Sequence, residues 1–225
     1  MSKKKKRIVV RVEIATLSNR DEKLNKKKMD RLAMVLSNLQ NSGKNLLIVS
    51  SGAISLGKEK LKLEKPLKTF VEKQAAAAIG QVELIKLYQK FFDEYNQIVA
   101  QVLLPSDIIS NKIRVEKTRN TLETLLEMNI IPIINENDAV STTDIELDDN
   151  YPLALNVAKM VNADIILLKF NANGKFLIIP KGQKKAILAN NEYALFEKIK
   201  ELCSKNSVKR VNKFSYPSTV DEIVY

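Results

Sequence analysis

Strand-like and helix-like segments alternate along this sequence, and no other feature narrows the possible folds as much. Short apolar runs rich in β-branched residues are each typical of a buried strand. They lie at residues 8–12, 46–49, 98–104, 130–134, 165–168 and 175–179. Apolar residues at helical spacing occupy residues 24–41, 66–96, 114–128, 153–161 and 192–203. This alternation predicts an α/β fold, a mostly parallel sheet with helices on both faces.

Two details of the pattern bear on domain organisation. Asn173-Gly174 is a typical hairpin turn, so residues 175–179 are expected to form a hairpin arm with the preceding strand. No Gly/Ser-rich linker and no internal repeat interrupts the chain, and we interpret residues 1–225 as a single domain. In an open sheet of this kind, ligands are expected at the carboxyl ends of the strands.

The scarcity of histidine and cysteine excludes several kinds of site. The chain contains no histidine and one cysteine, Cys203, so imidazole catalysis, His-ligated zinc and thiolate clusters are excluded, and no metal site is predicted. A single cysteine cannot form an internal disulfide, which is typical of a reducing compartment. No apolar run approaches the ~18 residues of a membrane helix, and the basic start at residues 1–7 leads into a strand. We therefore expect a cytoplasmic protein without a membrane partner.

The formal net charge of +11 has two interpretations. Basic domains often bind nucleic acid. The alternative is a scatter of surface lysines, because lysines dominate the 37 basic residues. The chain has no arginine-rich stretch and no aromatic residues interleaved with the basic ones, which base stacking would require. These features disfavour nucleic-acid binding as the main role.

Two polar segments directly follow predicted strands. Ser50-Ser51-Gly52-Ala53 predicts a tight turn into a helix, whose N-terminal N–H groups attract anions. The alternative is an ordinary serine-capped helix. Asn135-Glu136-Asn137-Asp138 combines two amides with two carboxylates, which suit an amino-acid ammonium or a hydroxyl-rich ligand. Its alternative is an Asx turn whose side chains cap backbone groups.

Two further polar segments carry less information. Asp148-Asp149-Asn150 precedes the predicted helix at residues 153–161. It could cap that helix, place an amide on a ligand or bring a carboxylate near magnesium, and capping is the simplest interpretation. Asn171-Ala172-Asn173-Gly174 is most simply a hairpin turn.

Five segments, taken in their order, resemble the kinase domain of glutamate 5-kinase, a branch of the amino-acid kinase family. They are Ser50–Ile54, Glu72–Gln81, Ala100–Leu104, Arg119–Leu126 and Ile133–Val140. The resemblance extends over residues 7–176 and implies a three-layer α/β/α sandwich around a mainly parallel sheet. It also implies the family's reaction, in which the γ-phosphoryl group of ATP passes, with magnesium, to the side-chain carboxylate of glutamate as the first step of proline synthesis.

The glutamate half of the family pattern is retained. The resemblance implies a substrate pocket formed by Ser51, Gly52, Asn135, Asp138 and Asn150. Ser51 matches the serine before the glycine of an SGA-type turn, Asp138 matches the last residue of an NEND segment, and Asn150 matches the asparagine of a GDND-type segment. The expected ligand is a small amino acid, glutamate or an analogue.

The nucleotide half of the pattern is altered. Arg11 stands where the family has a catalytic lysine, and Glu13 stands where it has a glycine that lets the backbone approach phosphate. Phe170 and Asn171 align with a Thr-Asp pair that contacts the nucleotide, and Tyr151 replaces an acid of the GDND-type segment. The family's glycine-rich loop has no counterpart after residue 180, so we interpret the domain as shortened at its C-terminal end.

These changes leave two functional hypotheses. A carboxylate at Glu13 would repel a triphosphate, so the first is a glutamate-binding homologue, non-catalytic or impaired, that acts by regulation without a cofactor. The alternative is an active kinase with a divergent nucleotide site, which uses Mg-ATP to phosphorylate the γ-carboxylate of glutamate. Following the habit of the family, we expect a homo-oligomer in both cases.

Overall fold

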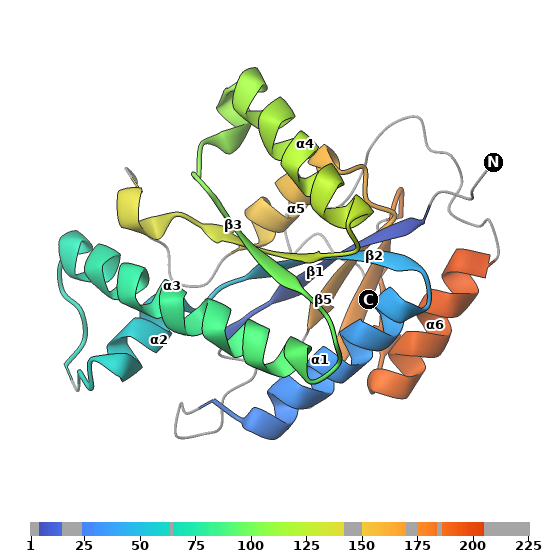
Figure 1. Ribbon diagram of the computed structural model, residues 1–225, viewed down its shortest axis with the longest axis horizontal. Coiled ribbons are helices and arrows are strands. Elements are labelled where there is room, and N and C mark those ends of the chain that lie inside the picture. The colour runs from blue at the N-terminus through green and yellow to red at the C-terminus, as the bar shows by residue number, and fades with distance from the viewer. Residues whose placement is uncertain are drawn as a thin grey trace.

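The computed structural model describes residues 5–14, 24–63, 65–141, 150–169, 175–183 and 186–204. The strands are β1 (Lys6–Val12), β2 (Lys44–Ser50), β3 (Val99–Leu104), β4 (Ile131–Glu136), β5 (Ile165–Lys169), β6 (Phe176–Pro180) and β7 (Ile187–Ala189). The helices are α1 (Lys26–Asn41), α2 (Ala53–Lys60), α3 (Phe70–Asp93), α4 (Lys112–Glu127), α5 (Tyr151–Met160) and α6 (Glu192–Ser204), with short 3-10 turns at η2 (Ile108–Ser110) and η3 (Asp138–Val140). Figure 1 shows the sheet in the middle of the molecule with helices above and below it.

The strands form one sheet in the order β3-β4-β2-β1-β5-β6-β7. The neighbours from β3 to β5 pair in parallel, which confirms the predicted mainly parallel sheet. Strand β6 pairs antiparallel with β5, so the predicted hairpin arm is confirmed. Strand β7 continues the sheet antiparallel to β6 and was not predicted, because its three residues are too short a run to recognise.

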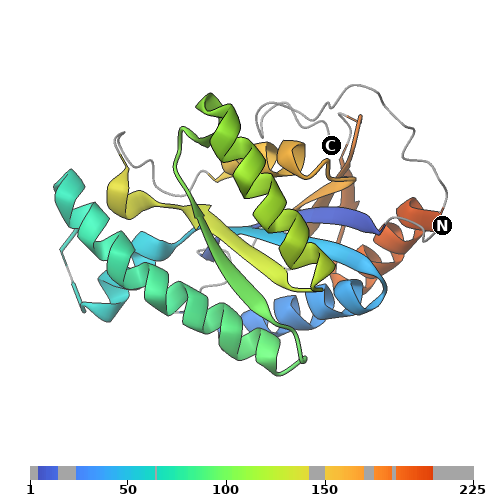
Figure 2. The same cartoon turned by 45° about the horizontal axis from the view of Figure 1, so that its top comes forward.

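Helices cover both faces of this sheet and complete three layers. Strand β1 is buried on both faces, with Ile8 and Val10 facing one core and Val9 facing the other. The first core packs against α1, α3 and α6, whereas the second packs against α4 and α5. Figure 2 shows the same separation from a second direction. The α/β/α sandwich is therefore confirmed, and it follows from strands that are apolar on both faces.

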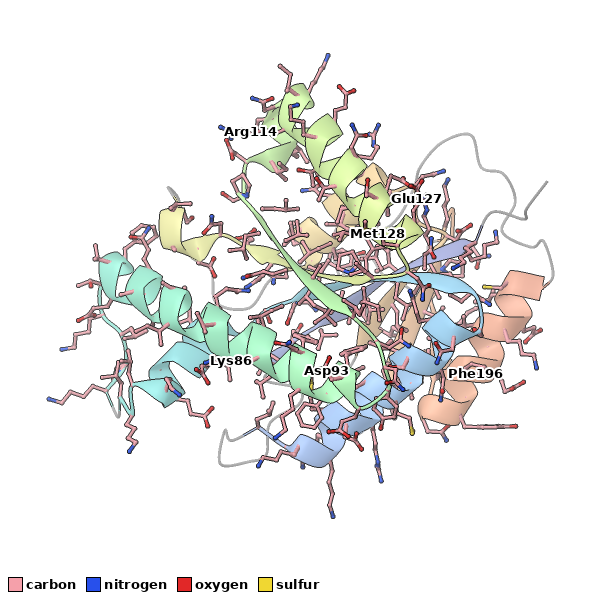
Figure 3. The ribbon with its side chains drawn as sticks, viewed as in Figure 1. Lys86, Asp93, Arg114, Glu127, Met128 and Phe196 are labelled. Carbon is pink, nitrogen blue, oxygen red and sulfur yellow. The ribbon has the colours of Figure 1, made fainter. Side chains whose placement is uncertain are left out.

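Helix α3 has clear signals at its start and on its two sides. Thr69 and Glu72 form a reciprocal capping box, in which each side chain accepts a backbone N–H of the other residue. The backbone N–H groups of Thr69 and Lys68 both donate to the Glu72 carboxylate, and these bonds lower the pKa of this exposed group. Lys86 and Asp93, labelled in Figure 3, lie on the exposed side of the helix. The opposite side of α3 packs on the sheet.

Several element boundaries differ from the sequence-based predictions. Strand β4 was expected to end before Asn135, but it extends to Glu136 because residues 131–136 pair in full with β3. Helix α5 begins at Tyr151, two residues earlier than expected, because Pro152 occupies the first turn, where no backbone N–H is required. Helix α4 also begins earlier, at Lys112, where the Asn111 side chain caps it.

Within the described ranges, none of the helices combines the length and the apolar character needed to span a bilayer.

Candidate functional site

The predicted substrate residues follow strands whose carboxyl ends share one edge of the sheet. Strands β1 and β2 end level with each other, with Val12 beside Ser50. Strand β4 lies on the other side of β2 and is parallel to it, with Ile134 beside Val49. Consequently Ser51, immediately after β2, and Asn135, near the end of β4, are brought to the same edge, as the rule for open α/β sheets predicts.

The turn after β2 requires glycine for two independent reasons. Gly52 has a φ of +101°, a left-handed conformation that side chains other than glycine rarely adopt. A Cβ added to Gly52 would also lie 2.5 Å from the Cβ of Ile14. Gly52 is the N-cap of α2, and no side chain caps this helix, so the alternative of an ordinary serine-capped helix is wrong. The Ser51 backbone N–H instead donates to the Val12 carbonyl at 3.0 Å.

Two glycines let α2 and α3 approach at backbone distance. A Cβ on Gly80 would lie 1.6 Å from the Ala53 carbonyl oxygen, and a Cβ on Gly57 would lie 1.9 Å from the Ala76 carbonyl oxygen. The first turn of α2 therefore rests directly on the middle of α3. This contact brings Gln81, the neighbour of Gly80, to the edge of the sheet where Ser51 lies.

A chain of buried amides joins three elements at this edge. The Asn150 Nδ2 group donates both to the Ser50 carbonyl and, at 3.1 Å, to Asn135 Oδ1. The Asn135 Nδ2 group donates in turn to Gln81 Oε1 at 2.9 Å. Asn150, Asn135 and Gln81 are all at least nine-tenths buried. The structure thus brings together Asn135 and Asn150, which the sequence singled out, and adds Gln81, which it did not.

The sequence did contain one signal for Gln81. It follows Gly80 in the middle of a long helix, where a glycine costs roughly 1 kcal/mol relative to alanine and usually marks a close approach. That signal indicates helix packing but does not reveal which side chain beside the glycine meets the strand ends.

Tyr88 contacts the turn through a buried hydrogen bond to Ser50. Its hydroxyl donates to Ser50 Oγ at 2.9 Å, and the ring is fully buried. Burial raises the pKa of this phenol far above its ordinary value, so Tyr88 keeps its proton and remains a donor at physiological pH. Ser50 Oγ in turn donates to the Ser51 carbonyl at 3.2 Å.

A cavity of about 190 Å³ lies between α3, β3 and the segment that follows β4. This volume accommodates several water-sized groups, as a small ligand requires. Its polar lining residues are Gln81, Gln101, Glu136, Asn137 and Asp138. Asp138, another of the predicted substrate residues, therefore lines a cavity that Gln81 connects to the buried amides. Burial raises the pKa of the Glu136 carboxyl.

Two polar atoms of this region have no hydrogen-bond partner among the described residues. They are Ser51 Oγ and Gln81 Nε2, and both are enclosed. A buried donor left without an acceptor costs about 1–3 kcal/mol, so native proteins retain few of them. Gln81 lines the cavity, whereas Ser51 is not among the lining residues.

Arg11 and Glu13 form an ion pair at the end of β1. The expected repulsion by a free Glu13 carboxylate is therefore overestimated, because the Arg11 guanidinium already neutralises it. Arg11, the cation that replaces the family lysine, is therefore already engaged by Glu13. Phe170 and Asn171 would follow Lys169 at the end of the neighbouring strand β5, but these two residues, like Asp148 and Asp149, lie outside the described residues. The described ranges contain no group of three or more His, Cys, Asp or Glu residues that could hold a metal ion.

Comparison with known proteins identifies the family. The family model described as "Amino acid kinase family" matches residues 7–190, most of the chain. The chain belongs to the amino acid kinase family. Among curated members, it is 40% identical over 203 residues to glutamate 5-kinase of Clostridium perfringens (strain 13 / Type A), covering 88% of this chain and 76% of that protein.

Other relatives agree on the branch and on the fold. The chain is 42% identical over 190 residues to glutamate 5-kinase of Listeria innocua serovar 6a, covering 83% of this chain and 69% of that one. The resemblance to glutamate 5-kinase is therefore confirmed. The solved UMP kinase of Ureaplasma parvum matches with a TM-score of 0.52 and 16% identity over 76% of this chain and 71% of that chain, and this likeness concerns the fold alone.

Proposed function

We propose that this chain binds glutamate at the carboxyl edge of its sheet and transfers the γ-phosphoryl group of ATP to the side-chain carboxylate of the bound glutamate. The observation that supports the proposal most is the buried amide chain from Ser50 through Asn150 and Asn135 to Gln81, beside a cavity of small-metabolite size. The relatives at 40% and 42% identity carry the name glutamate 5-kinase, which is consistent with this substrate.

The chemistry of the cavity suits an amino acid. Asp138 and Glu136 supply carboxyl groups for an ammonium, and a charge-assisted hydrogen bond in a partly desolvated site is roughly twice as strong as a neutral one. Ser51 Oγ and Gln81 Nε2 supply polar atoms that the protein itself does not use within the described ranges. Under this proposal Ser51, Gly52 and the two asparagines form the remainder of the glutamate site.

The phosphate end fits its ligand less closely. A guanidinium binds carboxylate and phosphate with the same forked geometry, and that of Arg11 holds the Glu13 carboxylate. Arg11 would hold a phosphate oxygen once Glu13 is exchanged for it, and Phe170 and Asn171 are proposed to face the nucleotide. ATP, with magnesium, supplies the phosphoryl group. The residues of this chain bind glutamate and orient its side-chain carboxylate.

A second candidate function is glutamate binding without phosphoryl transfer. The ion pair between Arg11 and Glu13 favours it, because the pair cancels the positive charge that a triphosphate would meet. Phosphoryl transfer depends almost wholly on positioning and on neutralisation of charge. A chain that holds glutamate and has lost that charge would act as a regulatory or scaffolding protein.

Two measurements separate these candidates. Hydroxylamine traps an acyl phosphate as a hydroxamate, so the full-length chain incubated with glutamate, Mg-ATP and hydroxylamine should form hydroxamate only when all three are present. Calorimetry with glutamate alone reports binding independently. Glutamate binding without hydroxamate supports the second candidate, and absence of glutamate binding contradicts both.

The remaining expectations for the chain are also proposals. All described strands belong to one sheet, which supports the interpretation of a single domain. A homo-oligomer is proposed from the exposed edge of that sheet and is tested below.

A further inference from the structure

The buried amide chain determines which way round the Gln81 side chain sits. A backbone carbonyl can only accept, so the bond to the Ser50 carbonyl requires the nitrogen of Asn150. That same nitrogen also contacts Asn135, which must therefore present its oxygen to Asn150. Asn135 is left with its nitrogen facing Gln81, so Gln81 must present its oxygen to Asn135. The oxygen and nitrogen of a side-chain amide are hard to tell apart by position alone. Here the Ser50 carbonyl determines the orientation of all three amides, because it can only accept.

This order leaves a donor at the end of the chain. The Oε1 atom of Gln81 is used within the protein, whereas Nε2 has no acceptor among the described residues. Gln81 is also a lining residue of the 190 Å³ cavity, together with Asp138 and Glu136. A side chain in this position offers N–H groups and cannot turn to offer oxygen without breaking the bond from Asn135. The lining of the cavity therefore includes Gln81, whose enclosed Nε2 donor is unpaired among the described residues, together with two residues that carry carboxyl groups.

We propose that Gln81 is a specificity-determining residue, whose Nε2 group donates a hydrogen bond to the α-carboxylate of the bound amino acid. The proposal rests on the proposed function and names the contact that selects its substrate. In an amino acid the α-carboxylate and the α-ammonium are one carbon apart, and one cavity here presents a fixed donor from Gln81 and an acid from Asp138. The amide chain through Asn135 and Asn150 serves to hold that donor in place.

The test is the substitution Gln81→Glu, which keeps an oxygen to accept from Asn135 and replaces the donor with a second oxygen. Calorimetry on the full-length chain should show glutamate binding weakened by about 10-fold or more, the usual effect of losing a hydrogen bond to a charged group. Gln89→Glu is the matched control, because Gln89 lies two turns away on α3, is exposed and does not line the cavity. That control should bind glutamate as the unsubstituted chain does.

Two further ligands separate recognition from a merely structural role. Isoglutamine carries an amide in place of the α-carboxylate, and glutamine carries one in place of the γ-carboxylate. We expect Gln81→Glu to shift the preference from glutamate toward isoglutamine, whose amide N–H groups suit the introduced carboxylate, while the ratio of glutamate to glutamine stays unchanged. Gln81→Met removes the donor without adding a charge and should bring glutamate and isoglutamine closer in affinity, so the test survives if the acidic variant does not fold.

Each other outcome overturns the proposal. Equal loss of all three ligands would assign Gln81 a structural role, and a shift in the ratio of glutamate to glutamine would place it at the γ-carboxylate. Unchanged glutamate binding by both variants would remove Gln81 from the site. Failure of the unsubstituted chain to bind glutamate would instead contradict the proposed function itself, and the inference with it.

Discussion

At the scale of single residues, charged groups mark both ends of the candidate site. Asp138 and Glu136 line the cavity, and Glu13 pairs with Arg11 at the end of β1. The carboxyl groups of Asp138 and Glu136 suit a ligand cation, whereas the Glu13 carboxylate is already neutralised by Arg11. Replacing one charged group at a time by its uncharged isostere therefore tests each end of the site separately.

We expect Asp138→Asn to abolish most of the glutamate affinity. The change removes the counter-charge for the ligand ammonium but keeps the size of the side chain, so binding should fall about 10- to 100-fold. The increase in melting temperature that glutamate produces by mass action should disappear with it. Asp107→Asn is the matched control, because Asp107 is exposed and lies before η2, away from the cavity. A normal glutamate-induced shift in Asp138→Asn would contradict the assignment of Asp138.

Glu13→Gln should strengthen Mg-ATP binding. The substitution releases the Arg11 guanidinium from its carboxylate partner and removes a negative charge from the end of β1, so the dissociation constant measured by calorimetry should fall several-fold. Glu59→Gln, on the exposed side of α2, controls for the change in net charge. If the two variants bind Mg-ATP equally, the Arg11–Glu13 pair does not limit access of the nucleotide.

Glu136→Gln should make the free protein more stable near neutral pH. Burial raises the pKa of this carboxyl, so its ionised form is less favourable in the folded state than in the unfolded chain. Its contribution to stability is therefore complete below the unfolded pKa and is lost as the pH rises through the folded pKa. The melting temperature of the variant should exceed that of the unsubstituted chain at pH 7, and the difference should shrink as the pH falls toward 4.5, the ordinary pKa, and vanish below it. A difference that does not depend on pH would contradict this origin.

At the scale of elements, the crossing of α2 and α3 positions the site. The two helices meet through Gly57 and Gly80, and each glycine faces a carbonyl oxygen of the other helix. The contact supports the turn at Gly52 on one helix and Gln81 on the other. A wider separation would remove Gln81 from Asn135 and break the amide chain.

Gly80→Ala should therefore destabilise the protein, against the direction that helix propensity predicts. Alanine in place of glycine inside a helix normally gains about 1 kcal/mol, but its Cβ here would lie 1.6 Å from the Ala53 carbonyl oxygen. Overpacking of this kind costs about 1–3 kcal/mol or more. Urea denaturation should show the loss, and Ala75→Gly, at an exposed position of the same helix, should show only the propensity cost of about 1 kcal/mol. A stabilised Gly80→Ala variant would contradict the close crossing.

At the scale of the whole molecule, one edge of the described sheet is exposed. Strand β3 ends the sheet on one side, and Ile98, which precedes it, is 65% exposed. Val82 on the neighbouring helix α3 is 50% exposed. An edge strand with apolar neighbours favours pairing with another chain. The homo-oligomer remains a prediction, and this edge is the surface that we propose for it.

Ile98→Lys should weaken self-association without lowering the stability of the folded chain, because a charge on an edge opposes edge-to-edge pairing. Sedimentation velocity over a range of protein concentrations should show a dimer or a larger assembly for the unsubstituted chain and a shift toward monomer for the variant. Tyr193→Lys is the control, since Tyr193 is 78% exposed on α6, a helix that packs near β6 and β7, far from β3 in the strand order. A monomeric unsubstituted chain would contradict the prediction.

Local sequence determined the architecture and most of the candidate site. Apolar runs on both faces of the central strands require a covered parallel sheet, and a parallel sheet brings the residues after its strands to one edge. The order of residues along the chain is therefore enough to group Ser51, Asn135 and Asn150, and to indicate the need for glycine at position 52. The left-handed φ of Gly52 and the bond between Asn135 and Asn150 agree with that grouping. Their role in glutamate binding remains a prediction.

Only the tertiary structure decided the contacts between elements that are distant in the sequence. Helical spacing shows which side of α3 is apolar but not which loop meets Gln81, because the helix crossing depends on close packing at Gly57 and Gly80. The sequence likewise predicted that the Glu13 carboxylate would repel a triphosphate, whereas in the structure Glu13 pairs with Arg11. A charge acts through its distance from other charges, and a donor acts through the acceptor it faces. The sequence gives the residue types, but the distances between these groups are set only when the chain folds.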